Sequence, residues 1–542
     1  MNNDSGSSVS LWMATAHVDT QPMLKMAEVT DADACIVGAG IAGLSVAYYL
    51  LSAGKSVVVL DDGPIGGGET SRTTAHLSNA LDEGYVKLER LHGKQGAHLA
   101  ADSHSAAIDA IERIVQTEKL DCDFVRLPGY LFAAPGDSAE QLDRELAAAH
   151  RAGLQQVVKL DAVPLSTFAT CQCLKYPDQG QFHALKYLRG LASAVARMGG
   201  RIYTHTHANE FHGGKDEYVK TRTGARVHCR HIVVATNTPV NDRLVLHAKQ
   251  AAYRSYVIGA RVRSGAVPKA LYWDTAEPYH YVRLAATESP DWEILIVGGE
   301  DHRTGDRDDA AKRYAALESW ARERFPGIDA IEYRWSGQVM EPVDGLAFIG
   351  HNPADDDNVY VATGDSGHGM THGTIAGLLI TDLILGRDNP WAKLYAPSRK
   401  RLGAAWALTK HGAHTATRYV EYLTGGEVGS AKEIAPGSGA VVRRGFSKLA
   451  VYRDDAGKLH ECSAACSHMG CIVHWNHEEK SWDCPCHGSR FDPYGAVLNG
   501  PALEPLARVG EHPRNGHKNS AAAHATSSSK KAEDASEKAP VR

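Results

Sequence analysis

Apolar stretches along this chain are short, and turns rich in glycine separate them. Residues 33–61 begin with an apolar strand at 34–37, continue into an apolar helix that reaches Leu51, and end in a second apolar strand at 56–60. This is the β-α-β pattern of a parallel sheet whose strands are joined by a helix. It predicts an α/β domain in the first part of the chain.

Later stretches divide into three kinds. Two further buried strands each end in a turn of small residues, at 232–237 and 359–370, and the second continues into an apolar helix at 373–385. Strand-like composition without intervening helices predicts a mostly antiparallel sheet, at 253–262, 280–284 and 293–297. A helix-prone linker is expected at 396–425, and a turn-rich all-β section at 426–510.

The first turn has the spacing of a dinucleotide-binding loop. Gly38 permits the tight turn, Gly40 lets the backbone approach a pyrophosphate, and Gly43 lets the helix pack close to the strand. The helix N-terminus supplies amide donors, and Asp61, eighteen positions after Gly43, can accept from a ribose hydroxyl. The motif predicts nucleotide binding without separating NAD from FAD.

Three later segments favour FAD. A Gly-rich turn with Thr, Ser and Arg after the second strand can wrap a diphosphate, and its candidate ligands are Arg72, Thr73 and Thr74. The strand at 232–237 can contact the adenylate. A glycine loop before the last apolar helix can close over the flavin ring through Gly364, Asp365, Gly367 and Gly369, and the helix dipole there favours negative charge on reduced flavin.

Residues 466–489 carry a second kind of chemistry. Cys466 and His468 form one Cys-x-His pair, Cys484 and His487 form a Cys-x-x-His pair, and fifteen residues separate the two. One thiolate and one imidazole from each loop are what an asymmetric [2Fe-2S] cluster needs, with two Cys on one iron and two His on the other. A structural zinc site is the alternative, but zinc does not account for the further cysteines Cys471 and Cys486.

Composition adds limits. The chain has 542 residues, 43% hydrophobic and 23% charged, with a net charge of −6, so nothing in its charge points to a nucleic-acid partner. We find no run long enough for a transmembrane helix and no secretory signal, and we expect a cytoplasmic protein. Residues 1–30 and 511–542 are poor in apolar residues, and we expect both to be disordered.

The motifs resemble two families. Residues 31–395 are similar to FAD-dependent oxidoreductases of the D-amino-acid oxidase and sarcosine oxidase type. That resemblance implies a Rossmann-like FAD domain with an interleaved antiparallel-sheet substrate domain, mainly 245–330. Residues 426–510 resemble the disulfide-bearing Rieske family, a small all-β fold, which implies a [2Fe-2S] cluster held by the four ligands above and a Cys471–Cys486 disulfide.

The two halves together imply a dehydrogenase. Flavin accepts two electrons as a hydride and the cluster accepts one, so reduced flavin is drained stepwise to an external quinone, ferredoxin or cytochrome. The substrate implied is an amine or amino acid. Two alternatives stay open: an oxygen-using amine oxidase with a regulatory Rieske domain, and an electron-transfer flavoprotein fed by NAD(P)H.

Three residues are candidates for a role in catalysis. His368 lies in the predicted closing loop, Arg283 can bind a carboxylate, and Tyr281 can line the pocket. In high-potential Rieske proteins, as the resemblance implies, a Ser follows the second His ligand by two positions and a Tyr follows that Ser by two. Here Ser489 is kept and Phe491 replaces the Tyr, which predicts a potential in the middle of the Rieske range.

Overall fold

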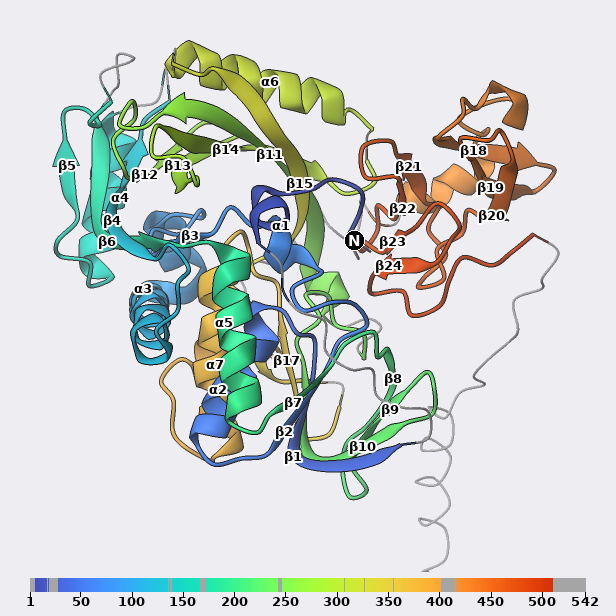
Figure 1. The fold of residues 1–542 in the computed structure, drawn as a ribbon, viewed down its shortest axis with the longest axis horizontal. Helices are drawn as coiled ribbons and strands as arrows, with labels where there is room; N and C mark the ends of the chain where they lie inside the picture. The colour runs from blue at the N-terminus through green and yellow to red at the C-terminus, as the bar shows by residue number, and fades with distance from the viewer. Residues whose placement is uncertain are drawn as a thin grey trace, which may run out of the picture.

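The structure is a computed structural model that describes residues 5–16, 18, 28–134, 136, 139–165, 172–241, 246–306, 308–325, 327–353, 355–400, 415 and 417–509. These residues form a parallel sheet with its helices, a large antiparallel sheet, and a smaller C-terminal domain (Figure 1). The predicted tail, 511–542, lies outside the described residues, as does most of the first half of the 396–425 linker.

The parallel sheet has the strand order β16-β17-β10-β1-β2-β7. Strands β1, β2, β7, β10 and β17 run parallel, β16 is antiparallel to β17, and the hairpin β8–β9 joins through β10. Its strands are β1 (Val29–Val37), β2 (Val57–Leu60), β7 (Arg201–Tyr203), β8 (Ala208–His212), β9 (Tyr218–Thr221), β10 (Arg226–Val234), β16 (Phe348–His351) and β17 (Val359–Thr363). The predicted β-α-β unit at 33–61 is confirmed.

Helices α2 (Ile41–Ser52), α5 (Ala184–Arg197) and α7 (Gly369–Ile384) lie together against this sheet (Figure 1). Helices α2 and α7 approach closely, because a Cβ at Gly377 would lie 2.8 Å from the Cβ of Ser45. The long helix α3 (Tyr85–Glu118), which breaks at Gly93, crosses α7, and the short α8 (Ala392–Tyr395) follows. Close packing of α2 on α7 brings the first glycine loop next to the last one.

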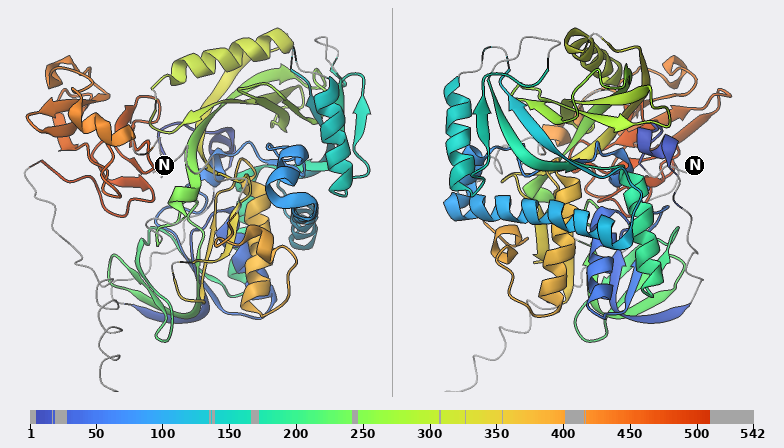
Figure 2. Two further views of the ribbon diagram at one scale, coloured as in Figure 1. Left: turned by 180° about the vertical axis from the view of Figure 1, so that it is seen from behind. Right: turned by 60° about the vertical axis from the view of Figure 1, so that its left-hand side comes forward.

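The antiparallel sheet has the order β15-β11-β14-β13-β12-β4-β6-β3, with β5 on β6, and only β12 and β4 pair in parallel. Helix α6 (Ala310–Arg324) lies across β11 and β14, and α4 (Ala139–Arg151) packs at the far end (Figure 2). The strands are β3 (His76–Leu77), β4 (Val125–Phe132), β5 (Val158–Leu160), β6 (Cys173–Gln181), β11 (Gln250–Arg263), β12 (Leu271–Asp274), β13 (His280–Ala286), β14 (Trp292–Arg303) and β15 (Ala330–Pro342).

The predicted substrate-domain range of 245–330 covers β11 to β14 but misses the rest of this sheet. Strands β3 to β6 come from residues 76–181, before the second half of the parallel sheet. Strand β15 continues to Pro342. Pairing between distant segments decides membership of a sheet, and local composition does not reveal it.

The C-terminal domain contains two small antiparallel sheets, β18-β19-β20 and β21-β22-β23-β24. Trp482, Phe491 and Val473 are buried in the core between them. The strands are β18 (Ser438–Arg444), β19 (Ser447–Arg453), β20 (Leu459–Ser463), β21 (His474–Asn476), β22 (Ser481–Asp483), β23 (Arg490–Phe491) and β24 (Val497–Asn499), preceded by the 3-10 turns η4 (Tyr419–Leu423) and η5 (Ala431–Glu433). This agrees with the all-β prediction.

The prediction that residues 1–30 are disordered is wrong for residues 5–16. They form an ordered segment with a short helix, α1 (Leu11–Thr15), in which Leu11 and Trp12 are buried. Ser8 and Ser10 donate hydrogen bonds to Glu479 and to the Ser71 carbonyl. A serine-rich segment is ordered here because its hydroxyl groups meet buried partners that are distant in sequence.

Among the helices of the described ranges, none has the length and apolar composition that crossing a membrane requires.

Candidate functional site

One cavity of about 310 Å³ lies between the parallel and antiparallel sheets. Its wall includes the first glycine loop, the turn after β2, the closing loop before α7, and strands of the antiparallel sheet. Leu498, Asn499 and Gly500 of the C-terminal domain line the same cavity. All three units of the molecule therefore meet at this one space.

The first glycine loop has the tight geometry that the motif predicts. Gly38 has a φ of +111°, and a Cβ there would lie 2.3 Å from the Ala235 carbonyl oxygen. A Cβ at Gly43 would lie 1.8 Å from the Gly38 carbonyl oxygen, so only glycine permits this packing of α2. Gly38 and Gly40 line the cavity, and the Asp61 carboxylate accepts hydrogen bonds from the amides of Ala39 and Gly63 at 2.5 and 2.9 Å.

The turn after β2 reaches the cavity through η1 (Glu69–Arg72). Thr73 and Thr74 line the cavity, while the Arg72 guanidinium, which also reaches the wall, points to the C-terminal domain. Arg72 donates to Ser8 Oγ at 2.7 Å and forms an ion pair with Glu479 at 3.2 Å. Its side chain thus holds the interface between domains.

The closing loop and the N-terminus of α7 complete the cavity. Gly364, Asp365, Gly367 and Gly369 all line it. Burial raises the pKa of Asp365 to about 7. Among the described residues, Asp365 Oδ1 and Asn237 Nδ2 are buried polar atoms of the cavity wall without a hydrogen-bond partner. A ligand rich in hydrogen-bonding groups satisfies such atoms, so the residues present fit FAD.

Tyr281, Tyr279, Ser255 and His76 form the side of the cavity that the antiparallel sheet provides. Tyr281 Oη and Ser255 Oγ are hydrogen-bonded at 2.8 Å, and Tyr279 Oη donates to Asp301 Oδ2 at 3.4 Å. Burial raises the pKa of Asp301 to about 7. Asp301 thus contacts a cavity-lining side chain and titrates near neutrality.

Sequence reasoning did not single out Asp301 as a site residue. Glu341, on β15, was also missed, and burial raises its pKa to about 8. The sequence carries little signal for Asp301 and Glu341, because a lone carboxylate on a strand looks like an ordinary solvent-facing residue. Only the fold brings Asp301 and Glu341 close to Asp82, and Asp82 is the one of these three carboxylates that lines the cavity.

His368 lies at the N-terminus of α7 and lines the cavity, as the prediction requires. Its Nε2 lies 3.2 Å from Asp82 Oδ1. Burial works to lower the pKa of His368, but Asp82 and Asp365 outweigh it, and the net shift is upward. Behind it, His104 and His372 are hydrogen-bonded to each other at 3.2 Å.

Arg283 does not line the cavity, which contradicts the prediction that it binds a substrate carboxylate. Its Nη1 donates to the carbonyl oxygens of Thr74, Ala75 and Phe182 at 2.7 to 3.1 Å. Burial lowers the pKa of Arg283 to about 9. The guanidinium instead ties the turn after β2 to the segment between β6 and α5, because its donors satisfy backbone carbonyl oxygens of both.

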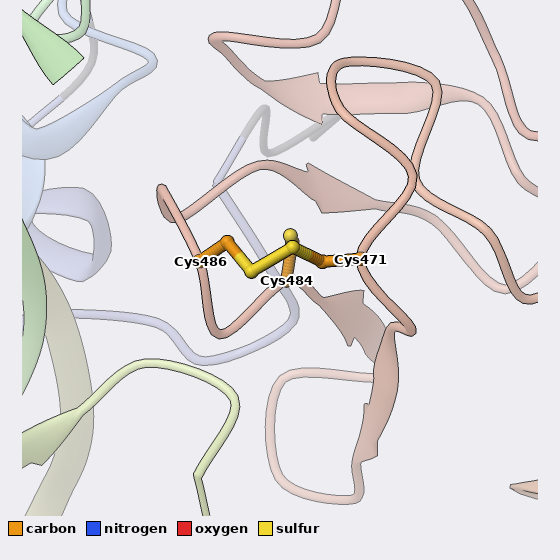
Figure 3. Close-up of side chains that lie close together, drawn as sticks. All are labelled: Cys471, Cys484 and Cys486. Atoms are coloured by element: carbon orange, nitrogen blue, oxygen red, sulfur yellow. A yellow bond between two sulfur atoms is a disulfide. The ribbon is translucent and has the colours of Figure 1, made fainter. Parts of the chain in front are cut away.

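The cluster loops lie in the C-terminal domain against β11 and β15. The sulfurs of Cys471 and Cys486 are bonded, as the resemblance implied, and Cys484 lies beside this disulfide (Figure 3). Three sulfurs gather there, but two are bonded to each other, so this group alone is not a metal site. A hydrogen bond between Cys466 and Cys484 lowers the pKa of the first thiol and raises that of the second, so the two sulfurs that would hold one iron are in direct contact.

The predicted histidine ligands face each other. The ring centroids of His468 and His487 are 5.1 Å apart, and the two cysteines left free of the disulfide, Cys466 and Cys484, are both buried. Ser489 hydrogen-bonds toward Cys466, whereas Phe491 is fully buried and brings no hydroxyl. The donor set of two thiols and two imidazoles fits a [2Fe-2S] cluster with unlike irons.

A buried ionic contact joins the C-terminal domain to the rest of the chain. Glu479 is fully buried, and its carboxylate lies 3.2 Å from Arg72 and 3.5 Å from Arg254. Burial works to raise the pKa of Glu479, but the arginines outweigh it and lower the pKa to about 2. Arg254, on β11, is therefore committed to this contact as well.

Comparisons with known proteins agree with this geometry. The family model of FAD dependent oxidoreductases matches residues 33–383, and the Rieske [2Fe-2S] domain model matches residues 426–510. A putative Rieske 2Fe-2S iron-sulfur protein, YhfW of Bacillus subtilis (strain 168), is 30% identical over 92% of this chain and 97% of its own. Gamma-glutamylputrescine oxidoreductase of Escherichia coli (strain K12) is 27% identical over 67% of this chain and 86% of its own.

Among solved structures, glycine oxidase from Geobacillus kaustophilus superposes with a TM-score of 0.56 at 21% identity, and covers 68% of this chain and 99% of its own. That likeness shows the fold of the first two units. The family models show the two cofactors, FAD and a [2Fe-2S] cluster. The chain therefore belongs to the FAD-dependent oxidoreductases of the D-amino-acid oxidase type and carries a Rieske domain after the flavin-binding part.

Proposed function

We propose that this protein is an amine dehydrogenase that sends the electrons of its substrate through the Rieske cluster to an external acceptor. The substrate carbon gives up a hydride and its nitrogen a proton, which leaves an imine that water hydrolyses. FAD, when bound, takes the hydride. The two electrons then leave singly, because the cluster holds one at a time, and a quinone, ferredoxin or cytochrome receives them.

One observation carries this proposal: strand β15 separates the cavity from the cluster loops. Val339 and Gln338 of this strand line the cavity, and Gln338 Nε2 also donates to the Gly488 carbonyl oxygen at 3.0 Å. Gly488 follows the predicted ligand His487 directly. A redox site within one strand of a flavin site is well placed to drain it.

The cavity wall favours an amine over an amino acid. Among the described residues, Arg72 is the one arginine that lines the cavity, and Glu479 and Ser8 occupy its guanidinium. A substrate carboxylate would thus find no free bidentate partner there. Asp82 on the same wall favours a cationic substrate instead. The similarity to gamma-glutamylputrescine oxidoreductase supports the same choice.

Asp301 is the group best placed to take the proton of the amine. An ammonium group has no lone pair to assist hydride loss, so the substrate must first become neutral. A carboxylate with a pKa of about 7 suits that task, and Asp301 reaches the cavity through Tyr279. His368, held by Asp82, and Tyr281, held by Ser255, are the further candidates at this wall.

Anaerobic titration with a panel of amines and amino acids tests the proposal. An amine substrate should bleach the flavin first and then produce the EPR signal of a reduced mixed-ligand cluster, whereas α-amino acids should leave both unchanged. Hydrogen peroxide released in air at the rate of substrate loss would instead support an oxidase. Flavin bleaching by NADH without amine would support the NAD(P)H-fed alternative.

A further inference from the structure

Two buried side chains connect the cluster loops to β15 and to the turn that leads into β11. The first is Gln338 on β15, whose side chain is buried. Its Nε2 donates to Gly488 at 3.0 Å, and its Oε1 accepts from Thr304 Oγ1 at 3.2 Å. Because Gln338 also lines the cavity, one side chain touches both the flavin site and the loop of the second ligand pair.

The second contact is His247, in η2 (His247–Lys249) at the start of β11. Its ring is buried, and its centroid lies 5.2 Å from that of His468 and 6.1 Å from that of His487. Three residues further on, Gln250 Nε2 donates to Thr363 Oγ1 at 3.3 Å, and Thr363 lines the cavity. The chain runs from His247 directly into β11, whose Ser255 and Val257 line the cavity.

The ligand loop at 484–488 and the antiparallel sheet are in direct contact. A Cβ at Gly488 would lie 2.4 Å from the Cβ of Ala252 on β11. A Cβ at Gly305, after β14, would lie 2.8 Å from the backbone nitrogen of Pro485. The ligand loop at 484–488 therefore packs backbone to backbone against the antiparallel sheet, and the buried Glu479 contact fixes this arrangement.

We propose that Gln338 and His247 form a fixed route by which single electrons pass from the flavin site to the cluster, without movement of the C-terminal domain. This inference rests on the proposed function. Each transfer moves one electron from reduced flavin to the oxidised cluster, and two transfers with one proton released to water restore oxidised flavin. The chain itself covers the histidine side of the cluster. The external acceptor therefore takes each electron from another side.

Flash photoreduction of the bound flavin tests the route in the holoenzyme without a known substrate. Cluster reduction is followed by absorbance after the flash. Gln338→Leu removes the hydrogen bond at nearly constant volume, and His247→Ala opens a gap beside the ligands. Each should slow electron transfer on the order of tenfold, since displacement of reacting groups by an ångström costs up to about a hundredfold in rate.

Two further variants distinguish an electron-transfer route from a general loosening of the ligand loop. His247→Phe keeps a ring in the gap and should restore most of the rate lost in His247→Ala. Gln181→Leu is the matched control, because Gln181 Nε2 donates to the Leu284 carbonyl oxygen at 3.0 Å in the same sheet, away from the cluster. The EPR spectrum, the midpoint potential and hydrogen exchange at residues 484–489 should stay at wild-type values in His247→Phe.

Each outcome has one meaning. Absence of flavin-to-cluster transfer in the wild type would refute the proposed function and the route together. Transfer in the wild type at a rate that Gln338→Leu and His247→Ala leave unchanged would refute the route alone. Electron transfer could also slow in both variants in proportion to faster hydrogen exchange at residues 484–489, without rescue by His247→Phe. That result would mean that the two residues stabilise the loop, and it would overturn the inference.

Discussion

The C-terminal domain meets the rest of the chain through two contacts of opposite character. At Glu479 a buried carboxylate faces two arginines of the flavin-binding part, with serine hydroxyls of the N-terminal segment around it. At the cluster loops the amide of Gln338 makes a hydrogen bond and the ring of His247 packs against the predicted histidine ligands. Strands β11 and β15 contribute to both contacts, through Arg254 and Ser336 at Glu479 and through Ala252 and Gln338 at the cluster loops, but the two contacts perform different tasks.

Electrostatics explains the division. Ionic groups hold a domain in one orientation strongly, because a buried charge that loses its partner is costly. A fixed charge beside a cluster would, however, shift its potential, since the reduced cluster is the more negative state. The charged groups that flank the ligand loop, Asp483 and Arg490, are paired with each other at 3.1 Å. An ionic contact at Glu479 and an amide contact at the loop thus combine firm docking with little net charge beside the redox centre. The predictions below test this separation.

The largest effect is expected from Glu479→Ala. The change leaves Arg72 and Arg254 buried without their carboxylate, and it should reduce the free energy of unfolding by about 3–5 kcal/mol. Urea unfolding of the holoenzyme measures this. Glu478→Gln is the control, because this neighbouring carboxylate is only half-buried, and it should stay within about 0.5 kcal/mol of wild type. An unchanged midpoint in Glu479→Ala would contradict the docking role.

Ser8→Ala should have a smaller effect on the same contact. Ser8 Oγ donates to Glu479 at 2.6 Å and accepts from Arg72 at 2.7 Å, so its loss should cost about 1.5–3 kcal/mol, the range for hydrogen bonds to charged groups. Hydrogen exchange at residues 479–483 should rise. Ser193→Ala, at an exposed residue whose hydroxyl donates to the Arg189 carbonyl oxygen within α5, should leave exchange at wild-type values. Equal exchange in both variants would show that the N-terminal segment does not support the interface.

A charged contact inside the C-terminal part of the chain, between His474 and the carboxylates of Glu421 and Glu427, should make docking of the linker depend on pH. Glu421 and Glu427 overcome the effect of burial and raise the pKa of His474 to about 9. The raised pKa means that this stabilisation is complete below the unfolded value of about 6.5 and is lost as pH rises through about 9. After allowance for partial exposure it amounts to about 1–2 kcal/mol.

Hydrogen exchange at residues 419–427 should therefore increase between pH 6.5 and 9 beyond the intrinsic rise in exchange rate. His474→Gln should remove this increase, and His477→Gln, a change at an exposed histidine, should keep it. The same pH change should leave exchange at residues 484–489 unaltered, since the Gln338 amide that bonds this loop does not titrate.

These contacts also show which features the sequence can predict. The cluster donors come from 22 consecutive residues, 466–487, and the β-α-β unit from 33–61, so both could be identified from spacing alone. The Glu479 contact joins residues 8, 72, 254 and 479, and no local pattern connects them. Serines at the start of the chain therefore predicted disorder, although the fold uses them as buried hydrogen-bond partners.

The flavin cavity illustrates the same limit. Its glycines could be predicted because each one answers a local backbone requirement, as at Gly38 and Gly43. Arg283 could not be placed, because an arginine on a strand has the same appearance whether it faces a substrate or three backbone carbonyl groups. Asp301 became a candidate only when burial and Tyr279 were known.

The smallest expected effect is on the cluster itself. Phe491 is fully buried two positions after Ser489, which hydrogen-bonds toward Cys466. Phe491→Tyr adds a hydroxyl that can donate to a cluster sulfur, and such donors stabilise the reduced state. A neutral hydrogen bond worth about 0.5–1.5 kcal/mol corresponds, for one electron, to a rise of roughly 20–65 mV. Phe446→Tyr, at a side chain 99% exposed in the same domain, is the control and should leave the potential unchanged. Redox titration followed by EPR measures the potential of both variants. If the cluster of Phe491→Tyr is intact and its potential does not rise, the ring at position 491 does not face a cluster sulfur. Uncharged hydrogen-bonding groups would then contribute less to the potential than we infer.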